Sequence, residues 1–200
     1  MKLKTIATLF AKNKHLMLIN DNDGQQWVSN GFAIYKLQGL PKMSTDNVLR
    51  IFDIPPEKQP QWLCSESDEF ENLSLADSYD GDLEVDQHPL KVEWYDGDKF
   101  WNFYHEGRIY AINEKYIKPL MDEAGGITFW KRETKSGAFC LAVRNGFMVI
   151  AIIMPARLHQ DEVFVSTIRQ VASGYAIMAM EDIRDAALEL FKNQQDGEDA

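Results

Sequence analysis

The sequence predicts an α+β protein in which antiparallel sheet meanders carry two short internal helices and precede a C-terminal helical segment. Two observations predict this class. Strand-length apolar segments follow one another between turn signals such as Asn-Gly and Gly-Gly. Apolar residues also recur at helical spacing at the start of the chain, at two places within it and beyond residue 160.

A helix and a meander open the chain. A dense turn signal at residues 20–24 and a second one at Asn30-Gly31 separate three strand-like segments. Since Asn and Gly both tolerate a positive φ, we expect a tight hairpin turn centred on this pair. The residues that predict the helix are Leu3, Ile6, Leu9 and Phe10, and the expected strands are residues 15–19, 25–29 and 32–37.

A second helix and an acidic segment follow. Ser44 can cap a helix over residues 45–52, and Pro55-Pro56 ends it. Residues 57–91 then predict a loop-rich connection whose scattered Trp, Phe and Leu residues favour local packing. Between Lys58 and Lys91 this connection carries nine acidic residues and neither Lys nor Arg.

Residues 92–158 predict a hairpin–helix–hairpin unit. Asn113 can cap a helix over residues 114–123, which Pro119 is expected to shorten or kink. The last hairpin is expected to turn at Asn145-Gly146. The expected strands are residues 92–95, 100–104, 108–112, 127–132, 138–143 and 147–154.

The two Asn-Gly hairpins resemble each other, because residues 28–34 parallel residues 143–149. Either hairpins simply favour Asn-Gly, or residues 1–56 and 92–158 are related half-units of one domain over residues 1–158. The matched stretch is short, so we favour the first interpretation.

The end of the chain is predicted to be helical. Residues 159–193 keep a helical apolar period and are expected to pack on the domain, whereas residues 194–200 form a polar, disordered tail. Met178 and Met180 could mark a partner-binding face, although this spacing is more often core.

Composition favours a folded, soluble, cytoplasmic protein. Hydrophobic residues make up 45% and aromatic residues 12% of the chain, which argues against disorder. The longest apolar stretch, residues 147–154, is too short to span a membrane. A net charge of −10 disfavours nucleic acid and anionic membranes, but most of the excess lies in the connection and leaves room for a local basic face.

No catalytic or metal-binding motif is visible in the sequence. The four His residues lack metal-ligand spacing, and Cys64 and Cys140 are expected to be reduced structural thiols. The run from Asp77 to Asp82 lacks the spacing of a calcium loop, so we favour a solvated acidic loop, with a mimic of nucleic acid as an open alternative. We therefore expect no enzyme activity, no cofactor, no metal and no small-molecule ligand.

Four basic residues next to the internal helices are candidates for contact with phosphates. Lys42 and Arg50 accompany the first helix, and Lys115 and Lys118 share a face of the second. Such residues could hold DNA without reading its sequence. The alternative, an ordinary solvated face, carries more weight from the residues alone.

Residues 108–158 resemble part of the bacterial DNA polymerase sliding clamp, the beta subunit. The segment from Asn113 to Leu120, then residues 127–129, and finally Met-Pro-Ala-Arg-Leu at residues 154–158 carry this resemblance. It implies half-units of strands backed by helices that face DNA, with Lys115 and Lys118 on the DNA side. It also implies a partner-binding pocket at Met154, Pro155, Arg157 and Leu158.

The chain departs from the clamp pattern in several ways. A clamp subunit has three such domains and this chain has room for about one, while 42 residues follow Leu158 where clamps end. Pro119 and the acidic connection are further departures.

The expected function is a non-catalytic clamp-like domain in DNA transactions, of phage or mobile-element origin. Its expected partners are DNA, replication proteins and further copies of itself, with no membrane. The alternative is a protein-interaction module that uses the C-terminal helices or the acidic segment and binds no DNA.

Overall fold

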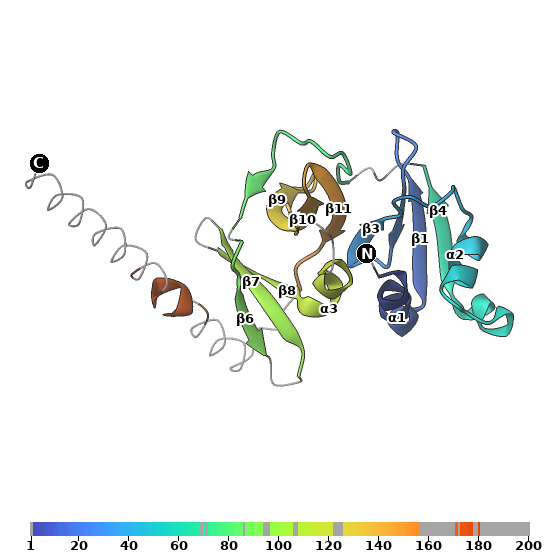
Figure 1. Ribbon diagram of the computed structural model, residues 1–200, viewed down its shortest axis with the longest axis horizontal. Coiled ribbons are helices and arrows are strands. Elements are labelled where there is room, and N and C mark those ends of the chain that lie inside the picture. The colour runs from blue at the N-terminus through green and yellow to red at the C-terminus, as the bar shows by residue number, and fades with distance from the viewer. Residues whose placement is uncertain are drawn as a thin grey trace, which may run out of the picture.

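The computed structural model describes residues 2–68, 70, 72–85, 87–93, 97–105, 108–121, 126–156, 171, 173–177 and 180. It confirms the α+β class, because a large mixed sheet and a smaller antiparallel sheet carry a few short helices (Figure 1).

The large sheet has eight strands in the order β4-β1-β2-β3-β11-β10-β9-β5. All neighbouring strands are antiparallel except β1 and β4, which are parallel. The strands are β1 (His15–Asn20), β2 (Gln26–Ser29), β3 (Ala33–Lys36), β4 (Leu63–Ser67), β5 (Leu83–Glu84), β9 (Thr128–Glu133), β10 (Phe139–Asn145) and β11 (Met148–Ile153).

Two helix–meander units meet at the centre of this sheet. Helix α1 (Leu3–Asn13) leads into β1–β3, while α3 (Glu114–Ile117) and the 3-10 turn η2 (Lys118–Leu120) lead towards β9–β11. Strands β3 and β11 pair antiparallel, with Ile34 opposite Ile152. The two Asn-Gly hairpins therefore occupy corresponding places in the two halves of the sheet.

Both predicted hairpins form, but their central residues differ from the prediction. Asn30 pairs with Ala33, and Asn145 pairs with Met148, so the turns are centred on Gly31-Phe32 and Gly146-Phe147. Gly31 and Gly146 have φ of +87° and +59°, whereas neither Asn has a positive φ. The turns are therefore centred one residue later than predicted, and they match type II′. Asn30 instead uses its side-chain oxygen to accept hydrogen bonds from Phe32 N and Ala33 N, each at 3.1 Å.

The connection contains strands that the sequence did not indicate. Strand β4 pairs in parallel with β1, and the short β5 pairs with β9. The sequence of β4, Leu-Cys-Ser-Glu-Ser, has no alternation of apolar residues because both its faces are largely exposed. Its strand conformation comes from backbone pairing with β1, which a local pattern does not reveal.

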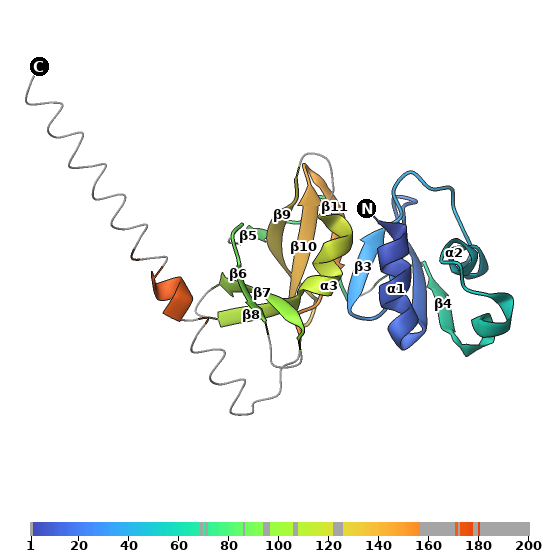
Figure 2. The same cartoon turned by 60° about the horizontal axis from the view of Figure 1, so that its bottom comes forward.

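One side of the large sheet, named here the helix face, is covered by α1, α2 (Thr45–Ile51), α3 and the small sheet (Figure 2). The small sheet has the order β6-β7-β8, with β6 (Leu90–Glu93), β7 (Lys99–His105) and β8 (Arg108–Asn113). Side chains from both halves share one core on this face; among them are Phe10, Tyr35, Trp101, Phe129 and Leu141.

The opposite side, named here the back face, is covered by part of the connection. Ile19, Ile34 and Ile152 alternate with residues of the helix face, and they pack against Leu73 and Leu75. The acidic connection therefore packs down over the sheet, as its apolar residues indicated.

The predicted caps of both internal helices are confirmed. The Ser44 side chain accepts a hydrogen bond from Asn47 N at 3.4 Å, and that of Asn113 accepts one from Lys115 N at 3.1 Å. The second helix is shorter than predicted, since it changes to a 3-10 turn at Lys118. Pro119 explains this, because a proline lacks the N–H that an α-helix uses.

Part of the predicted C-terminal helix is described. Residues 173–177 are helical, and Tyr175 reaches the small sheet, where its hydroxyl donates to Asn102 O. The remainder of residues 159–193 and the predicted tail, residues 194–200, lie outside the described residues. Among the described residues, no helix is long and apolar enough to cross a membrane.

Candidate functional site

An open groove between α1 and the α3–η2 segment is lined by five lysines. It has a volume of about 550 Å³ and is named here the lysine groove. Helix α1 and α3 lie side by side in Figures 1 and 2, and Lys2 N donates to Pro119 O at 3.0 Å where they meet. The lining residues are Lys2, Leu3, Lys4, Thr5, Thr8, Leu9, Lys12, Lys115 and Lys118.

Helix α1 carries positive charge where a helix usually prefers negative charge. Its first turn has no acidic residue, its N-cap has no side-chain hydrogen bond, and Lys2 and Lys4 stand at this end. The positive end of the helix dipole disfavours these cations but favours an anion placed beside them. Local preferences of this kind are commonly broken at functional sites.

A network of polar contacts positions the lysine of α3. Asp98 accepts a hydrogen bond from Asn113 Nδ2 at 2.7 Å and pairs with Lys115 Nζ at 3.6 Å. Lys115 Nζ also lies 5.2 Å from the centre of the Tyr116 ring. The Tyr116 carbonyl in turn accepts a hydrogen bond from the Tyr35 hydroxyl at 2.8 Å. The same surroundings raise the pKa of Tyr116, through burial first and the Asp98 charge second.

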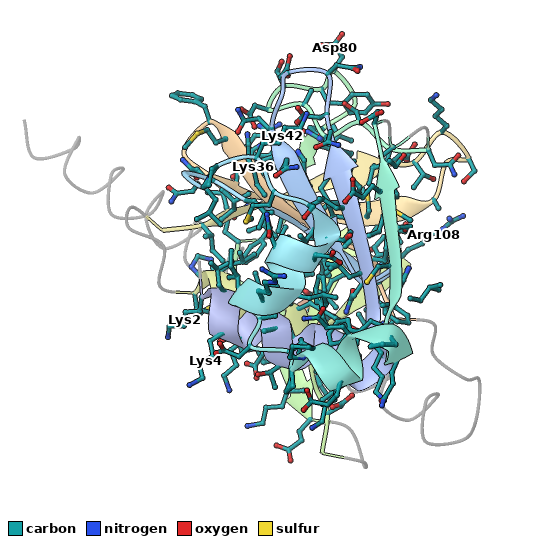
Figure 3. All side chains as sticks on the ribbon, turned by 90° about the vertical axis from the view of Figure 1, so that its right-hand side faces the viewer. Lys2, Lys4, Lys36, Lys42, Asp80 and Arg108 are labelled. Carbon is teal, nitrogen blue, oxygen red and sulfur yellow. The ribbon has the colours of Figure 1, made fainter. Side chains whose placement is uncertain are left out.

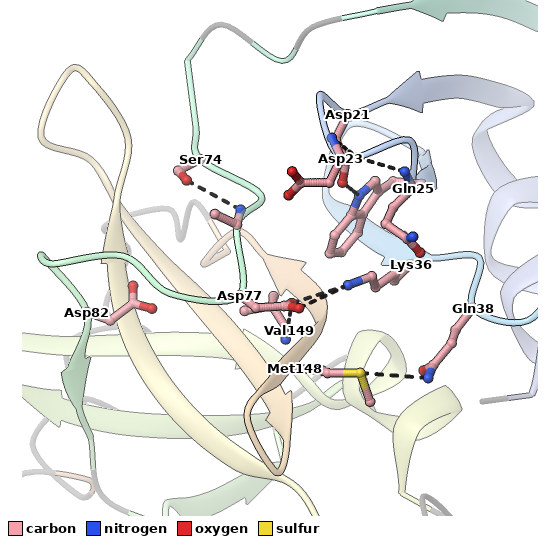
Figure 4. Close-up of polar contacts among 12 residues, drawn as sticks. Asp21, Asp23, Gln25, Lys36, Gln38, Ser74, Asp77, Asp82, Met148 and Val149 are labelled. Carbon is pink, nitrogen blue, oxygen red and sulfur yellow. Dashed lines mark hydrogen bonds and ion pairs between the residues drawn. The ribbon is translucent and has the colours of Figure 1, made fainter.

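Two carboxylates of the connection form ion pairs on the back face. Asp77 pairs with Lys36 at 3.2 Å and accepts a hydrogen bond from Val149 N at 2.9 Å (Figure 4). Asp82 is 3% exposed and accepts hydrogen bonds from the guanidinium groups of Arg132 and Arg144. These two carboxylates are therefore paired with cations on the side of the sheet opposite α1 and α3.

These ion pairs bear on the predicted acidic loop. The loop is not simply solvated, because Asp77 and Asp82 have separate cationic partners while Asp80 is exposed. Among the described residues, no group of three His, Cys, Asp or Glu side chains is arranged to hold a metal ion.

The structure brings two of the four predicted DNA-facing residues together. Lys115 and Lys118 both line the lysine groove. Lys42 and Arg50 are exposed but are not part of its lining, and Figure 3 shows Lys42 well apart from Lys2 and Lys4.

The predicted partner-binding residues are described only in part. Met154 and Pro155 are half-buried, and Met154 N donates to Phe32 O at 2.9 Å. The next residue, Ala156, donates from its N–H to Ala111 O at 2.8 Å, so this segment runs from the large sheet to the small one. Arg157 and Leu158 lie outside the described residues.

Three lysines of the groove were missed from the sequence, namely Lys2, Lys4 and Lys12. A signal was present, since the first twenty residues contain four Lys and no Asp or Glu. Lys4 and Lys12 also lie eight residues apart with Thr8 between them, a spacing that places all three on one side of a helix.

Comparison with known proteins adds nothing to this geometry. No protein-family model, no curated protein and no solved structure matches the chain.

Proposed function

We propose that this protein is a non-catalytic, clamp-like domain that holds duplex DNA in the lysine groove. The observation that carries the proposal is the meeting of α1 and α3, one from each half of the sheet, with lysines from both lining one groove. Lys4, Lys12 and Lys118 are exposed, and Lys115 is half-buried. Cations in this arrangement gain affinity for phosphates by releasing counterions from DNA.

The groove favours contact with the DNA backbone over reading of base edges. Its cations are all lysines, which act as point charges and lack the forked geometry with which arginine recognises guanine. Lys4 and Lys12 lie about 12 Å apart along the axis of α1. A row of this kind follows phosphates and carries no sequence preference.

The acidic connection supports one orientation on DNA. Part of the connection packs on the back face, and the connection has nine acidic residues and no Lys or Arg between Lys58 and Lys91. This charge disfavours DNA on that side while the lysine groove attracts it. Among the described residues, two helices, α1 and α3, line the groove, so enclosing DNA as clamps do requires further copies. The proposal therefore includes a homo-oligomer and partners among replication proteins.

A pair of matched double variants tests the groove. Lys12→Gln with Lys118→Gln removes two charges from the groove, and Lys42→Gln with Arg50→Gln removes two exposed charges elsewhere. Binding to a short duplex is measured by fluorescence anisotropy between about 50 and 200 mM salt. The groove variant should reduce the slope of log K against log salt by about 2, and the control should leave it unchanged.

Two results would contradict the proposal. One is equal loss of binding in both double variants. The other is a strictly monomeric protein, by light scattering, without affinity for duplex DNA even at the lowest salt concentration.

A further inference from the structure

The lysine groove has both charged and apolar side chains, and a DNA backbone would contact mainly the charged ones. Leu3 and Leu9 line it together with the methyl-bearing Thr5 and Thr8, and lysines surround them. Phosphates satisfy the ammonium groups but bury no apolar surface against leucine. A peptide with both acidic and apolar side chains matches both parts of the lining.

The chain contains two acidic segments, and two carboxylates of the first already have cationic partners. In the connection, Asp77 pairs with Lys36 and Asp82 pairs with Arg132, all on the back face of the sheet. The carboxylates of Asp77 and Asp82 are therefore engaged away from the groove.

The second acidic segment is residues 181–200. It contains seven acidic and two basic residues, a net charge of −5, and the groove has five lysines. Apolar residues are interspersed among the acids; they are Ile183, Leu188, Leu190 and Phe191. Charge and apolar content thus both match the groove.

The described residues that precede this segment contact the small sheet. The Tyr175 hydroxyl donates to Asn102 O on β7, and the rings of Tyr104 and Tyr175 lie 5.6 Å apart. Asn102 is opposite Ala111 on β8, and β8 leads directly into α3, which carries Lys115 of the groove. Twenty extended residues span up to about 66 Å, so residues 181–200 have ample length to reach.

We infer that residues 181–200 bind in the lysine groove of the same chain and compete there with DNA. The competition rests on the proposed DNA binding, whereas the intramolecular contact does not. A groove occupied by its own tail is unavailable to phosphates, which lowers the apparent affinity by the fraction of free groove. Salt weakens both contacts, so the inhibition is greatest at low ionic strength.

Neutralising the tail in the full chain tests the competition. The variant carries Glu181→Gln, Asp182→Asn, Asp185→Asn and Glu189→Gln. The control carries the same change in charge at exposed acids elsewhere, namely Asp53→Asn, Glu57→Gln, Asp80→Asn and Glu84→Gln. The tail variant should bind a short duplex about tenfold more tightly at about 50 mM salt, and the control should change by less than about threefold. Equal effects in the two variants overturn the competition.

Cross-linking tests the contact without DNA. A carbodiimide joins a carboxylate to a lysine only where the two touch, and the peptides are mapped by mass spectrometry in a mixture of ¹⁴N and ¹⁵N chains. Bonds from residues 181–200 to Lys4, Lys12, Lys115 or Lys118 within one chain support the inference. Their absence overturns it, and bonds between chains overturn it in favour of a second copy as the source.

The two experiments separate the two proposals. Cross-links within one chain together with no binding of duplex DNA leave the tail contact standing and contradict the proposed function. Salt-dependent DNA binding without these cross-links leaves the proposed function standing and contradicts the tail contact.

Discussion

Asp82 is a single carboxylate between two guanidinium groups on the back face. Arg132 is fully buried and also donates to Ser74 O at 2.8 Å and Ala76 O at 3.0 Å, so it ties the connection to the sheet. Asp82→Asn would leave two buried or nearly buried cations without a counter-charge. We expect the free energy of unfolding, measured in urea, to fall by about 3–5 kcal/mol.

The exposed Asp80 provides the control for this variant, because it has the same side chain two residues earlier in the chain. Asp80→Asn should change stability by less than about 0.5 kcal/mol. An equally small change in the free energy of unfolding for both variants would show that the ion pairs of Asp82 contribute little to stability.

Cys140 should make the protein less stable at alkaline pH. Burial raises the pKa of its thiol to about 12 from an ordinary value near 9. Above about pH 9 the unfolded chain releases this proton and the folded chain keeps it, so this thiol lowers the free energy of unfolding by about 1.4 kcal/mol per pH unit. The free energy of unfolding, measured in urea between about pH 9 and 11, should therefore fall less steeply with pH in Cys140→Ala than in the unchanged protein. The difference in slope should be about 1.4 kcal/mol per pH unit.

The Cys140 prediction concerns the slope and not the absolute stability, since the alanine variant also loses the contact from Sγ to Arg132 O. Other groups with raised pKa values, such as the buried Tyr35, contribute equally to both proteins. Parallel profiles for the two proteins would contradict the prediction.

The individual residues of the site were only partly predictable from the sequence. The i, i+3 spacing of Lys115 and Lys118 placed them on one helix face, and both line the groove. Lys42 and Arg50 were grouped with them because they also flank a short helix. Which helices meet is a property of the tertiary fold, and α1 rather than α2 lies beside α3.

At the scale of elements, the two hairpins offer a matched test of backbone strain. Gly31 and Gly146 both have a positive φ, and in this turn an L-alanine adopts such a conformation only at a cost of about 1–3 kcal/mol. An added methyl group would meet no atom within 4 Å at Gly146 and only the His15 ring at Gly31, with Nδ1 at 3.5 Å and Cε1 at 3.8 Å. Gly31→Ala and Gly146→Ala should therefore lower the free energy of unfolding by similar amounts in a urea titration. A much larger loss at Gly31 would mean that packing, and not φ, dominates there.

Most regular elements were predictable because their own side chains specify them. Alternating apolar residues and turn signals marked the meanders, and Ser44 and Asn113 marked helix starts. Strand β4 was not predictable, because its side chains are mostly exposed and pairing with β1 alone defines it.

At the scale of the molecule, the two halves should unfold together. They share one core on the helix face, and β3 pairs with β11 between them. Leu141→Ala, in the second half, should cost about 2–5 kcal/mol and lower the stability of both halves equally. Hydrogen exchange in urea should give the same midpoint for peptides from β1–β2 and from β9–β10. Separate midpoints would show that the halves are independent units.

The pairing of β3 with β11 at the centre of the large sheet could not be predicted from the sequence. The strands of each half were predictable from the residues of that half. The similarity of residues 28–34 to residues 143–149 also indicated that the two hairpins are alike. No local pattern states that β3 and β11 are neighbours, because both are apolar strands that could pair with many others.

The pairing of β3 with β11 also has a consequence for synthesis on the ribosome. Ile34 and Ile152 are opposite each other but 118 residues apart in the chain. At about 5–20 residues per second, translation leaves β3 without its partner for about 6–24 s. An open, apolar strand edge is a template for pairing with the wrong chain. During that interval the nascent meander is most exposed to misassembly with its neighbours on the same messenger RNA.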